Sequence, residues 1–195
     1  KTIDELTQSF ALEGISGGNA VFNTEKLDWM NAQYLGRLPV EQLAELVRPR
    51  FVEGAVVDHR VVADAARFHR LLELLRPRAK RLTDFVDQAR PLLIAPAEYE
   101  PEAIQKHLSA PGVTDHVAAL AVALRNAGPF DEPHVEKVVR GTAAEREIKA
   151  GQLIHVVRVA LTGRTVSPGL FELIVLLGRE ETLARLERLV AFLSA

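Results

Sequence analysis

The segment LTGRTVSPGL, residues 161–170, separates two apolar runs, IHVVRVA at 154–160 and FELIVLLGREETLARLERL at 171–189. Apolar residues three and four positions apart predict a helix on each side. Glycine and hydroxyl residues before a helix also suit a phosphate, but the nucleotide loop needs a Lys followed by Ser or Thr at the helix start. Here that place holds Ser-Pro-Gly-Leu. The segment is therefore predicted to be a turn in which Ser167 caps the second helix and Pro168 opens it.

Helical spacing extends along almost the whole chain, and no strand-like alternation with hairpin turns stands out. The pattern predicts an all-α fold of two helical bundles that meet near the proline-punctuated linker APAEYEP at 95–101. The first predicted helix starts at a capping box, Thr2-Ile-Asp-Glu5, and the second runs from Asn23 or Thr24 to Gly36. The third covers 39–49, and the fourth runs from a cap at Asp58 to Pro77. The remaining predicted helices cover 82–94, 101–109, 113–127, 131–141, 143–151, 152–162, 168–177 and 180–195.

Composition limits the classes of protein to which the chain can belong. Its 195 residues can form one domain or two small ones. Hydrophobic residues make up 48% but form no run near 18 residues, so no transmembrane helix and no membrane partner are expected. The start, KTIDELTQSF, has no initiator Met and no apolar signal core, which favours a piece of a longer protein. The absence of cysteine excludes disulfides, thiolate zinc sites and Cys nucleophiles.

The net charge of −2 hides two basic segments. Residues 48–90 carry 10 basic and 6 acidic side chains, and residues 137–195 carry 9 and 6. The other segments, 1–47 and 91–136, are net acidic. Two separated basic segments would let the protein hold a polyanion without being basic overall; the alternative is ordinary solvated Lys and Arg on exposed helices.

No catalytic or metal constellation is visible in the sequence. The carboxylate pair Glu180 and Glu181 lies in a charged helix and is expected to be solvated surface, and Ser167 has no Gly-x-Ser-x-Gly context. Trp29 and Tyr34 fall on apolar faces, which favours core packing over base stacking. The six histidines form no close pair with the ligand spacing of a helix, so no metal is assigned; they are His59, His69, His107, His116, His134 and His155.

Three blocks of sequence carry a family resemblance: FALEGISGGNAVFNTEKLDWMNAQYL at 10–35, LRPRAKRLTDF at 75–85, and GQLIHVVRVALTGRTVSPGLFELIVLLGREETLARL at 151–186. They strongly resemble, in the same order, the C-terminal body of bacterial-type glutamyl-tRNA synthetases. The resemblance implies that residues 1–40 end the stem-contact region. It also implies that 41–94 and 95–195 are two helical anticodon-binding domains.

The resemblance also implies partners and cofactors. The parent would be a cytoplasmic, monomeric class I enzyme that joins glutamate to its tRNA with ATP and Mg²⁺. Its HIGH and KMSKS-type motifs belong to an N-terminal catalytic domain, and neither occurs here. This chain alone is therefore expected to hold no cofactor and to be inactive. Its partners would be the anticodon loop of tRNA-Glu and the catalytic domain of the same parent chain.

Family motifs carried over position by position give the candidate site residues. The helix before LTGRTVSPGL and the following turn would line the pocket for the first two anticodon bases. Arg78, in the RPR context, matches the position that reads the third base, where Arg can donate two parallel bonds. At Val156 the sequence departs from the family, which commonly has a proline there, and this is expected to change the helix start near His155. The nominated tRNA-binding residues are Arg78, His155, Arg158, Ser167, Pro168 and Leu170.

Two other classes of function compete with tRNA binding. One is a helical protein-interaction module derived from a synthetase body that has lost RNA binding. The other is an autonomous enzyme with an unrecognised site. The intact set of Arg78, Arg158 and SPGLF favours RNA binding over the first, and the missing nucleophile–base or metal constellation counts against the second.

Overall fold

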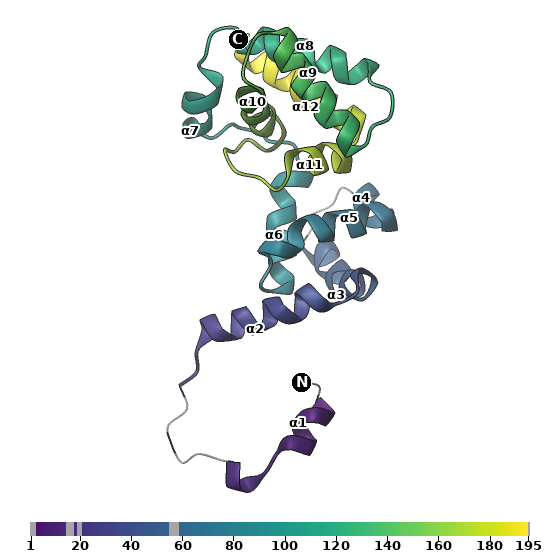
Figure 1. The fold of residues 1–195 in the computed structure, drawn as a ribbon, viewed down its shortest axis with the longest axis vertical. Helices are drawn as coiled ribbons and strands as arrows, with labels where there is room; N and C mark the ends of the chain where they lie inside the picture. The colour runs from purple at the N-terminus through teal and green to yellow at the C-terminus, as the bar shows by residue number, and fades with distance from the viewer. Residues whose placement is uncertain (1–2, 15–17, 19–20, 55–58, 195) are drawn as a thin grey trace.

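The computed structural model describes residues 3–14, 18, 21–54 and 59–194, and these form helices joined by turns, with no strand among them (Figure 1). The all-α prediction is confirmed. The first elements are α1 (Ile3–Ser9), η1 (Leu12–Gly14), α2 (Thr24–Arg37), α3 (Val40–Glu53), α4 (His59–Ala63), α5 (Ala65–Leu75), η2 (Arg76–Arg78) and α6 (Leu82–Leu93).

The remaining elements follow the linker, which is non-helical as predicted. The chain turns helical again at a proline, which suits the first helical position because it has no N–H to lose. These elements are α7 (Pro101–Ala103), a π turn η3 (Ile104–Leu108), α8 (Val113–Asn126), α9 (Glu132–Glu145), α10 (Ala150–Thr162), α11 (Leu170–Leu177) and α12 (Arg179–Leu193).

Helices α3 to α6 pack on one another and form what we call the first bundle. Its core contains three fully buried phenylalanines, Phe51, Phe68 and Phe85. The rings of Phe51 and Phe68 meet edge to face at 5.3 Å. Burial of each such side chain stabilises the fold by about 1.5–3 kcal/mol, so these rings account for much of this small core.

Helices α8 to α12 form the second bundle, in which α12 packs along α8 and α10. Figure 1 shows it at the end of the molecule opposite α1. The apolar run before residue 161 becomes α10 and the run after 170 becomes α11 and α12, so both predicted helical runs are confirmed. Leu161, Leu173 and Leu186 are fully buried and join these helices in one core.

The two bundles are joined by a buried arginine. Arg185 of α12 is 1% exposed and donates to the carbonyls of Leu92 at 2.9 Å, Leu93 at 3.1 Å and Leu161 at 2.6 Å. These carbonyls end α6 in the first bundle and α10 in the second, where helix carbonyls lack intrahelical partners. Its Nε donates to Glu181 at 2.7 Å. Arg185 therefore fixes the end of α6 to the end of α10.

Two predicted helix boundaries in the first bundle are wrong. Helix α3 continues past Pro49 to Glu53. The missing N–H of Pro49 costs little there, because Pro49 and Glu45 are exposed and water can bond the Glu45 carbonyl. The long helix predicted up to Pro77 breaks at Asp64, whose side chain accepts from Arg67 N at 3.1 Å and caps α5. The predicted cap Asp58 lies outside the described residues.

Two boundaries in the second bundle also differ from the prediction. No helix covers 143–151, because Glu147 adopts a φ of 56° and Ile148 N donates back to the Ala143 carbonyl at 3.0 Å, which closes α9. The second difference concerns Ser167. Helix α11 starts at Leu170 with Gly169 as its N-cap, so the predictions that Ser167 caps this helix and that Pro168 opens it are both wrong. The Ser167 hydroxyl is used elsewhere, as described below.

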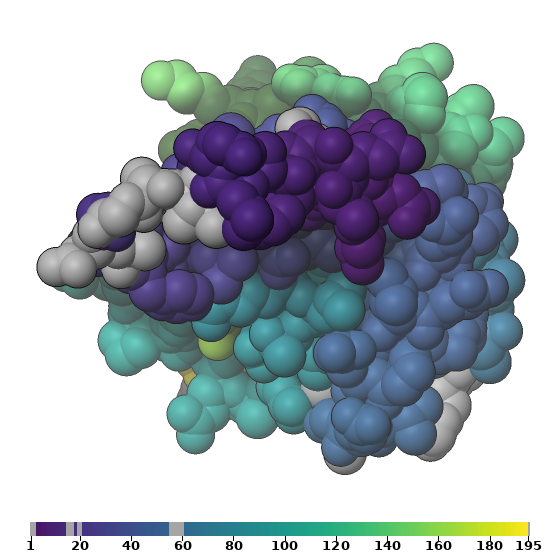
Figure 2. Space-filling view, turned by 90° about the horizontal axis from the view of Figure 1, so that it is seen from below, coloured from purple at the N-terminus to yellow at the C-terminus, as the bar shows by residue number. Residues whose placement is uncertain are grey.

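The N-terminal part of the chain is exposed. None of the residues of α1 is buried, and Figure 2 shows α1 and η1 in front of the rest when the molecule is seen from below. The prediction that Trp29 and Tyr34 pack in the core is wrong, since 61% and 50% of their surfaces are exposed. Helix α2 is instead held by polar contacts, with Arg81 donating to both carboxylate oxygens of Asp28 at 2.8 and 2.9 Å.

Candidate nucleic-acid interface

An open pocket of about 270 Å³ lies between the two bundles, and we call it the inter-bundle pocket. It brings together three of the residues nominated from the family resemblance, Arg78 from the first bundle and Ser167 and Pro168 from the second. The lining residues are Arg78, Asp87, Gln88, Pro91, Leu92, Thr162, Arg164, Val166, Ser167 and Pro168.

Arg78 ends the short turn η2 on the first-bundle side of this pocket. Gln88 Nε2 donates to the Arg78 carbonyl at 3.1 Å. Asp84 accepts from the N–H groups of Lys80 at 2.7 Å and Arg81 at 3.0 Å, which fixes the chain just after the turn. The backbone that carries Arg78 is thus held in place, while its side chain is exposed.

Arg158 projects from α10 and is held by its neighbours. Its Nε donates to Ser167 Oγ at 3.0 Å, and its Nη1 donates to His155 Nδ1 at 3.1 Å. The side chain is half-buried, and this burial lowers the pKa of the guanidinium from its usual value. Three nominated residues, Arg158, His155 and Ser167, therefore form one hydrogen-bonded group.

His155 is a neutral ring in this arrangement. A guanidinium can only donate, so Nδ1 of His155 accepts and Nε2 carries the proton. Its pKa is lowered by burial and, to a smaller extent, by the charges of Arg158 and Lys106. The ring stacks on His107, with the centroids 4.7 Å apart and the planes at 11°. The proline that the family commonly has at position 156 is a valine inside α10, and the helix runs through it from Ala150.

Gly163 makes the turn out of α10 possible. Its φ of 74° is in the left-handed region that favours glycine. A Cβ there would lie 2.8 Å from the carbonyl oxygen of Glu98 in the linker. The Gly163 carbonyl accepts from Glu100 N at 2.9 Å, so the linker crosses directly over this turn. The glycine in LTGR is therefore required by a close backbone crossing.

The last three nominated residues occupy different environments. Ser167 Oγ donates to the Pro168 carbonyl at 2.8 Å and accepts from Arg158, and Pro168 is half-buried at the pocket wall. Leu170 is only 4% exposed, so its side chain lies in the core. Any contact of Leu170 with a ligand would have to come from its backbone. The Glu172 carboxylate lies directly over Gly169, which adds negative charge at the start of α11.

The inter-bundle pocket also joins the two basic segments of the sequence. Arg78 comes from the segment 48–90 and Arg164 from the segment 137–195, and both line it. Sequence reasoning missed Arg164, although it stands inside the turn quoted at the outset, and it missed Gln88 and Pro91. The sequence did offer a signal for Arg164, which is an arginine in a polar loop beside a helix end. It offered no signal for Gln88 and Pro91, because only the fold brings α6 to this loop.

Neither metal-binding clusters nor membrane-spanning helices occur in the described ranges. No group of three or more His, Cys, Asp or Glu residues in this part of the chain is arranged to hold an ion. None of the described helices is long and apolar enough to cross a bilayer. The side chains that line the inter-bundle pocket offer hydrogen-bonding groups, the apolar faces of Pro91 and Pro168, and the positive charges of Arg78 and Arg164.

Comparison with known protein families shows to which family the two bundles belong. The family model described as the anticodon binding domain matches residues 42–190. The chain belongs to this family. The match spans both bundles and includes every nominated residue. Membership in the anticodon binding domain family agrees with the resemblance found from the sequence blocks.

Curated relatives and solved structures agree with the assignment to the anticodon binding domain family. Glutamate–tRNA ligase 2 of Koribacter versatilis is 41% identical over 185 residues, which cover 95% of this chain and 38% of that protein. The glutamate–tRNA ligase of Desulforudis audaxviator is 37% identical over 197 residues, which cover the whole chain and 39% of that protein. The chain thus spans about two fifths of the length of these relatives.

The crystal structure of a glutamate tRNA ligase from Elizabethkingia meningosepticum in complex with its amino acid superposes with a TM-score of 0.88 at 22% identity. The superposition covers 97% of this chain and 36% of that chain. At this identity the likeness shows the fold alone. The predicted likeness to glutamyl-tRNA synthetases is therefore confirmed in fold by the structure and in sequence by the curated relatives.

Proposed function

We propose that this chain binds the anticodon loop of tRNA-Glu and thereby supports glutamylation by a catalytic domain of the same parent protein. The observation that carries the proposal is the inter-bundle pocket, in which Arg78 faces Ser167 and Pro168. Unpaired RNA bases are recognised by stacking on flat side chains and by hydrogen bonds to their edges. The pocket offers both.

Each side of the pocket has a separate role in this proposal. Arg78 donates two parallel bonds to the edge of the third anticodon base, because its guanidinium is exposed on a fixed turn. Arg158, oriented by Ser167 and His155, contacts the first two bases or their phosphates. Pro168 supplies a flat apolar contact. Leu170 positions the start of α11 from the core.

The parent activity belongs to the same proposal. By analogy with its relatives, the parent would join glutamate to tRNA, and an N-terminal catalytic domain of the same chain would hold ATP and Mg²⁺. The parent would be a monomer and would work in the cytoplasm. Residues 1–40 would end a stem-contact region, and 41–94 and 95–195 would be two anticodon-binding domains. This chain alone would hold no cofactor and would not form glutamyl-adenylate.

The experiment that tests the proposal is tRNA binding by the isolated chain across a salt series. We expect binding that weakens with salt, because phosphate contacts release counterions, and that weakens again when the anticodon of tRNA-Glu is replaced. Glutamate-dependent ATP–pyrophosphate exchange should be absent. Binding that ignores the anticodon, or no binding at all, would overturn the proposal and favour a protein-interaction module.

A further inference from the structure

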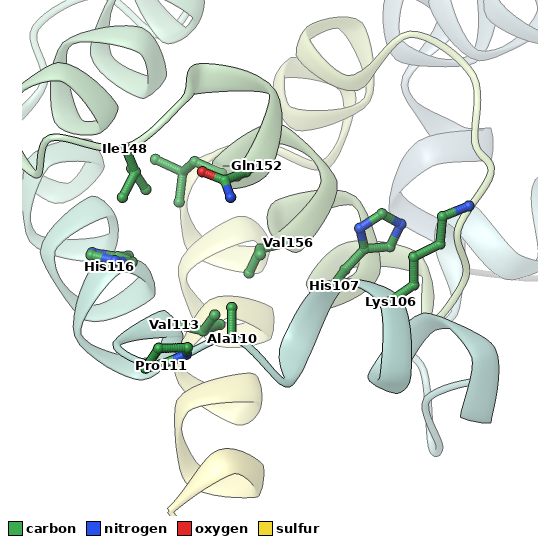
Figure 3. Close-up of a pocket in the computed structure, with 10 residues that line it drawn as sticks. Lys106, His107, Ala110, Pro111, Val113, His116, Ile148, Gln152 and Val156 are labelled. Atoms are coloured by element: carbon green, nitrogen blue, oxygen red, sulfur yellow. The ribbon is translucent and has the colours of Figure 1, made fainter.

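A second pocket lies in the second bundle, between η3, the start of α8 and the start of α10 (Figure 3). Its volume is about 120 Å³. The floor is aliphatic, from Val113, Leu153 and Val156, and His107 and Gln152 lie on its rim. We call it the histidine pocket. None of the residues nominated for the anticodon lines it.

The size and lining of the histidine pocket fit one flat ring. An apolar cavity of about 150 Å³ is known to take a benzene molecule, and this pocket is slightly smaller and open on one side. Unpaired RNA bases are recognised by stacking on aromatic rings, histidine included, and by hydrogen bonds to their edges, and this pocket offers the ring of His107 and the amide of Gln152. The Gln152 amide oxygen accepts from Lys149 N at 3.3 Å, which leaves its NH₂ group to donate.

The histidine pocket is connected to the candidate anticodon site by touching side chains. His107 lines the pocket and also stacks on His155 at 4.7 Å. His155 accepts from Arg158, and Arg158 donates to Ser167 of the inter-bundle pocket. A strand of RNA that lies on Arg158 would therefore reach the histidine pocket with its next nucleotide.

The backbone that presents His107 is unusual. Lys106 and His107 lie on the π turn η3, a rare local structure that is frequent at functional sites. Ser109 Oγ donates to the Ile104 carbonyl at 3.1 Å and closes the turn. Figure 3 shows the Lys106 side chain extending outward from the same turn, away from His116. Its ammonium group is thus placed beside the pocket and not inside it.

We infer that the histidine pocket receives one unpaired nucleotide directly flanking the anticodon, with Lys106 on its phosphate. The inference rests on the proposed function. The ligand class is a pyrimidine-sized base in single-stranded RNA, held by the aliphatic floor and the rim of His107 and Gln152.

The charges around the pocket support an RNA ligand. The pKa of His107 is lowered by burial first, and then by its basic neighbours His155, Lys106 and Arg158, while Glu102 acts in the opposite direction. A neutral imidazole presents a flat face to a base. The positive charge that a phosphate requires is supplied by Lys106 and Arg158.

The first test changes charge alone. In tRNA-Glu binding across a salt series, Lys106→Ala should lower the slope of log affinity against log salt by about 0.7, the value for one contact to a single-stranded phosphate. Lys137→Ala is the matched control, because Lys137 is an exposed lysine on α9 of the same bundle. It should leave the slope as in the unaltered chain.

The second test fills the pocket without changing charge. Ala110→Phe places a ring in the pocket from its exposed loop, and it should weaken tRNA binding roughly 5- to 100-fold, as loss of one stacked base does, with an unchanged salt slope. Ala118→Phe, on an exposed position of α8, is the matched control. With 5-fluorouridine at either flanking nucleotide, the unaltered chain should shift the ¹⁹F resonance at one of the two positions, and Ala110→Phe should abolish that shift.

The outcomes separate this inference from the proposed function. If the unaltered chain binds with anticodon dependence but Lys106→Ala and Ala110→Phe behave like their controls, the histidine pocket takes no nucleotide and the inference is wrong. If the unaltered chain shows no anticodon dependence, the proposed function fails instead. A loss for both Ala110→Phe and Ala118→Phe would point to a general defect and also count against the pocket.

Discussion

The arginines nominated on the two sides of the inter-bundle pocket differ, because Arg78 lines the pocket and Arg158 contacts it through Ser167. Arg78, on the first-bundle side, is exposed on a turn whose backbone is fixed by Gln88 and Asp84. Arg158, on the second-bundle side, is half-buried, and its guanidinium is oriented by Ser167 and His155. An exposed arginine on a fixed backbone can adapt to one base edge, whereas an arginine with two side-chain partners loses little freedom on binding.

This difference suggests two ways of reading a base. On the first side, specificity would come from the geometry of a single side chain, and a change of that residue would alter preference. On the second side, it would come from a group that is already assembled, and disruption of any member would weaken binding as a whole. Both depend on how the bundles are held together, to which Arg185 contributes along with the bond from Arg67 Nη2 to the Leu177 carbonyl at 3.1 Å.

Arg185→Met should have the largest effect, because it removes a fully buried charged contact between the two bundles. Three buried helix-end carbonyls, of Leu92, Leu93 and Leu161, would lose a charged donor. An unsatisfied buried group costs about 1–3 kcal/mol, so we expect a loss of roughly 2–5 kcal/mol in the free energy of unfolding. Urea denaturation with far-UV circular dichroism measures it.

The matched control is Arg179→Met. Arg179 also donates to several carbonyls, of Leu124, Arg125, Ala127 and Gly128, but all of them lie within the second bundle. Both variants should lose stability. Because the chain has no cysteine, a spin-label pair at Thr83 and Lys137 can report the spacing of the bundles. Its distance distribution should broaden for Arg185→Met only, and equal broadening in both would contradict the assignment.

Gly163→Ala should have the next largest effect, and it perturbs the second side alone. The residue would be strained at a φ of 74°, and its Cβ would meet the Glu98 carbonyl at 2.8 Å. We expect a loss of roughly 1–3 kcal/mol in the free energy of unfolding. Thermal denaturation gives the value. Gly151→Ala, where a Cβ would meet nothing within 4 Å, is the control and should be neutral or stabilising.

Asp84→Ala should have the smallest effect, and it perturbs the first side alone. Its carboxylate accepts from Lys80 N and Arg81 N beside the turn of Arg78. Loss of such a cap costs about 1 kcal/mol of the free energy of unfolding. Asp131→Ala removes a comparable cap from α9 in the second bundle and leaves the bonds that hold the turn intact. If both variants lose similar stability, but only Asp84→Ala weakens tRNA binding, the two sides are independent as described.

Much of the fold could be predicted from the sequence because helical periodicity is a local signal. Apolar spacing located α8, α10 and α12, and the linker was visible from its prolines. The errors came from tertiary structure. Pro49 is tolerated within α3 because it faces water, and Ser167 does not cap α11 because Arg158 takes its hydroxyl.

The candidate site was less accessible from the sequence. Residue-by-residue likeness nominated Arg78 and Ser167, but only the fold shows that they line one pocket. Arg164 and the stacked pair of His107 and His155 escaped notice, because their partners are distant in sequence. Arg185 was not nominated from the sequence, because its burial depends on where α6 ends.

The most direct test of the account measures how Arg78→Gln binds two tRNAs that differ only at the third anticodon base. Arg70→Gln is the control, since Arg70 is exposed on α5 and lines a neighbouring pocket together with Arg78. The account predicts that Arg78→Gln loses about 1–3 kcal/mol of preference for the cognate base, whereas Arg70→Gln weakens both tRNAs equally. Equal weakening of both tRNAs by Arg78→Gln, or no change, would contradict it.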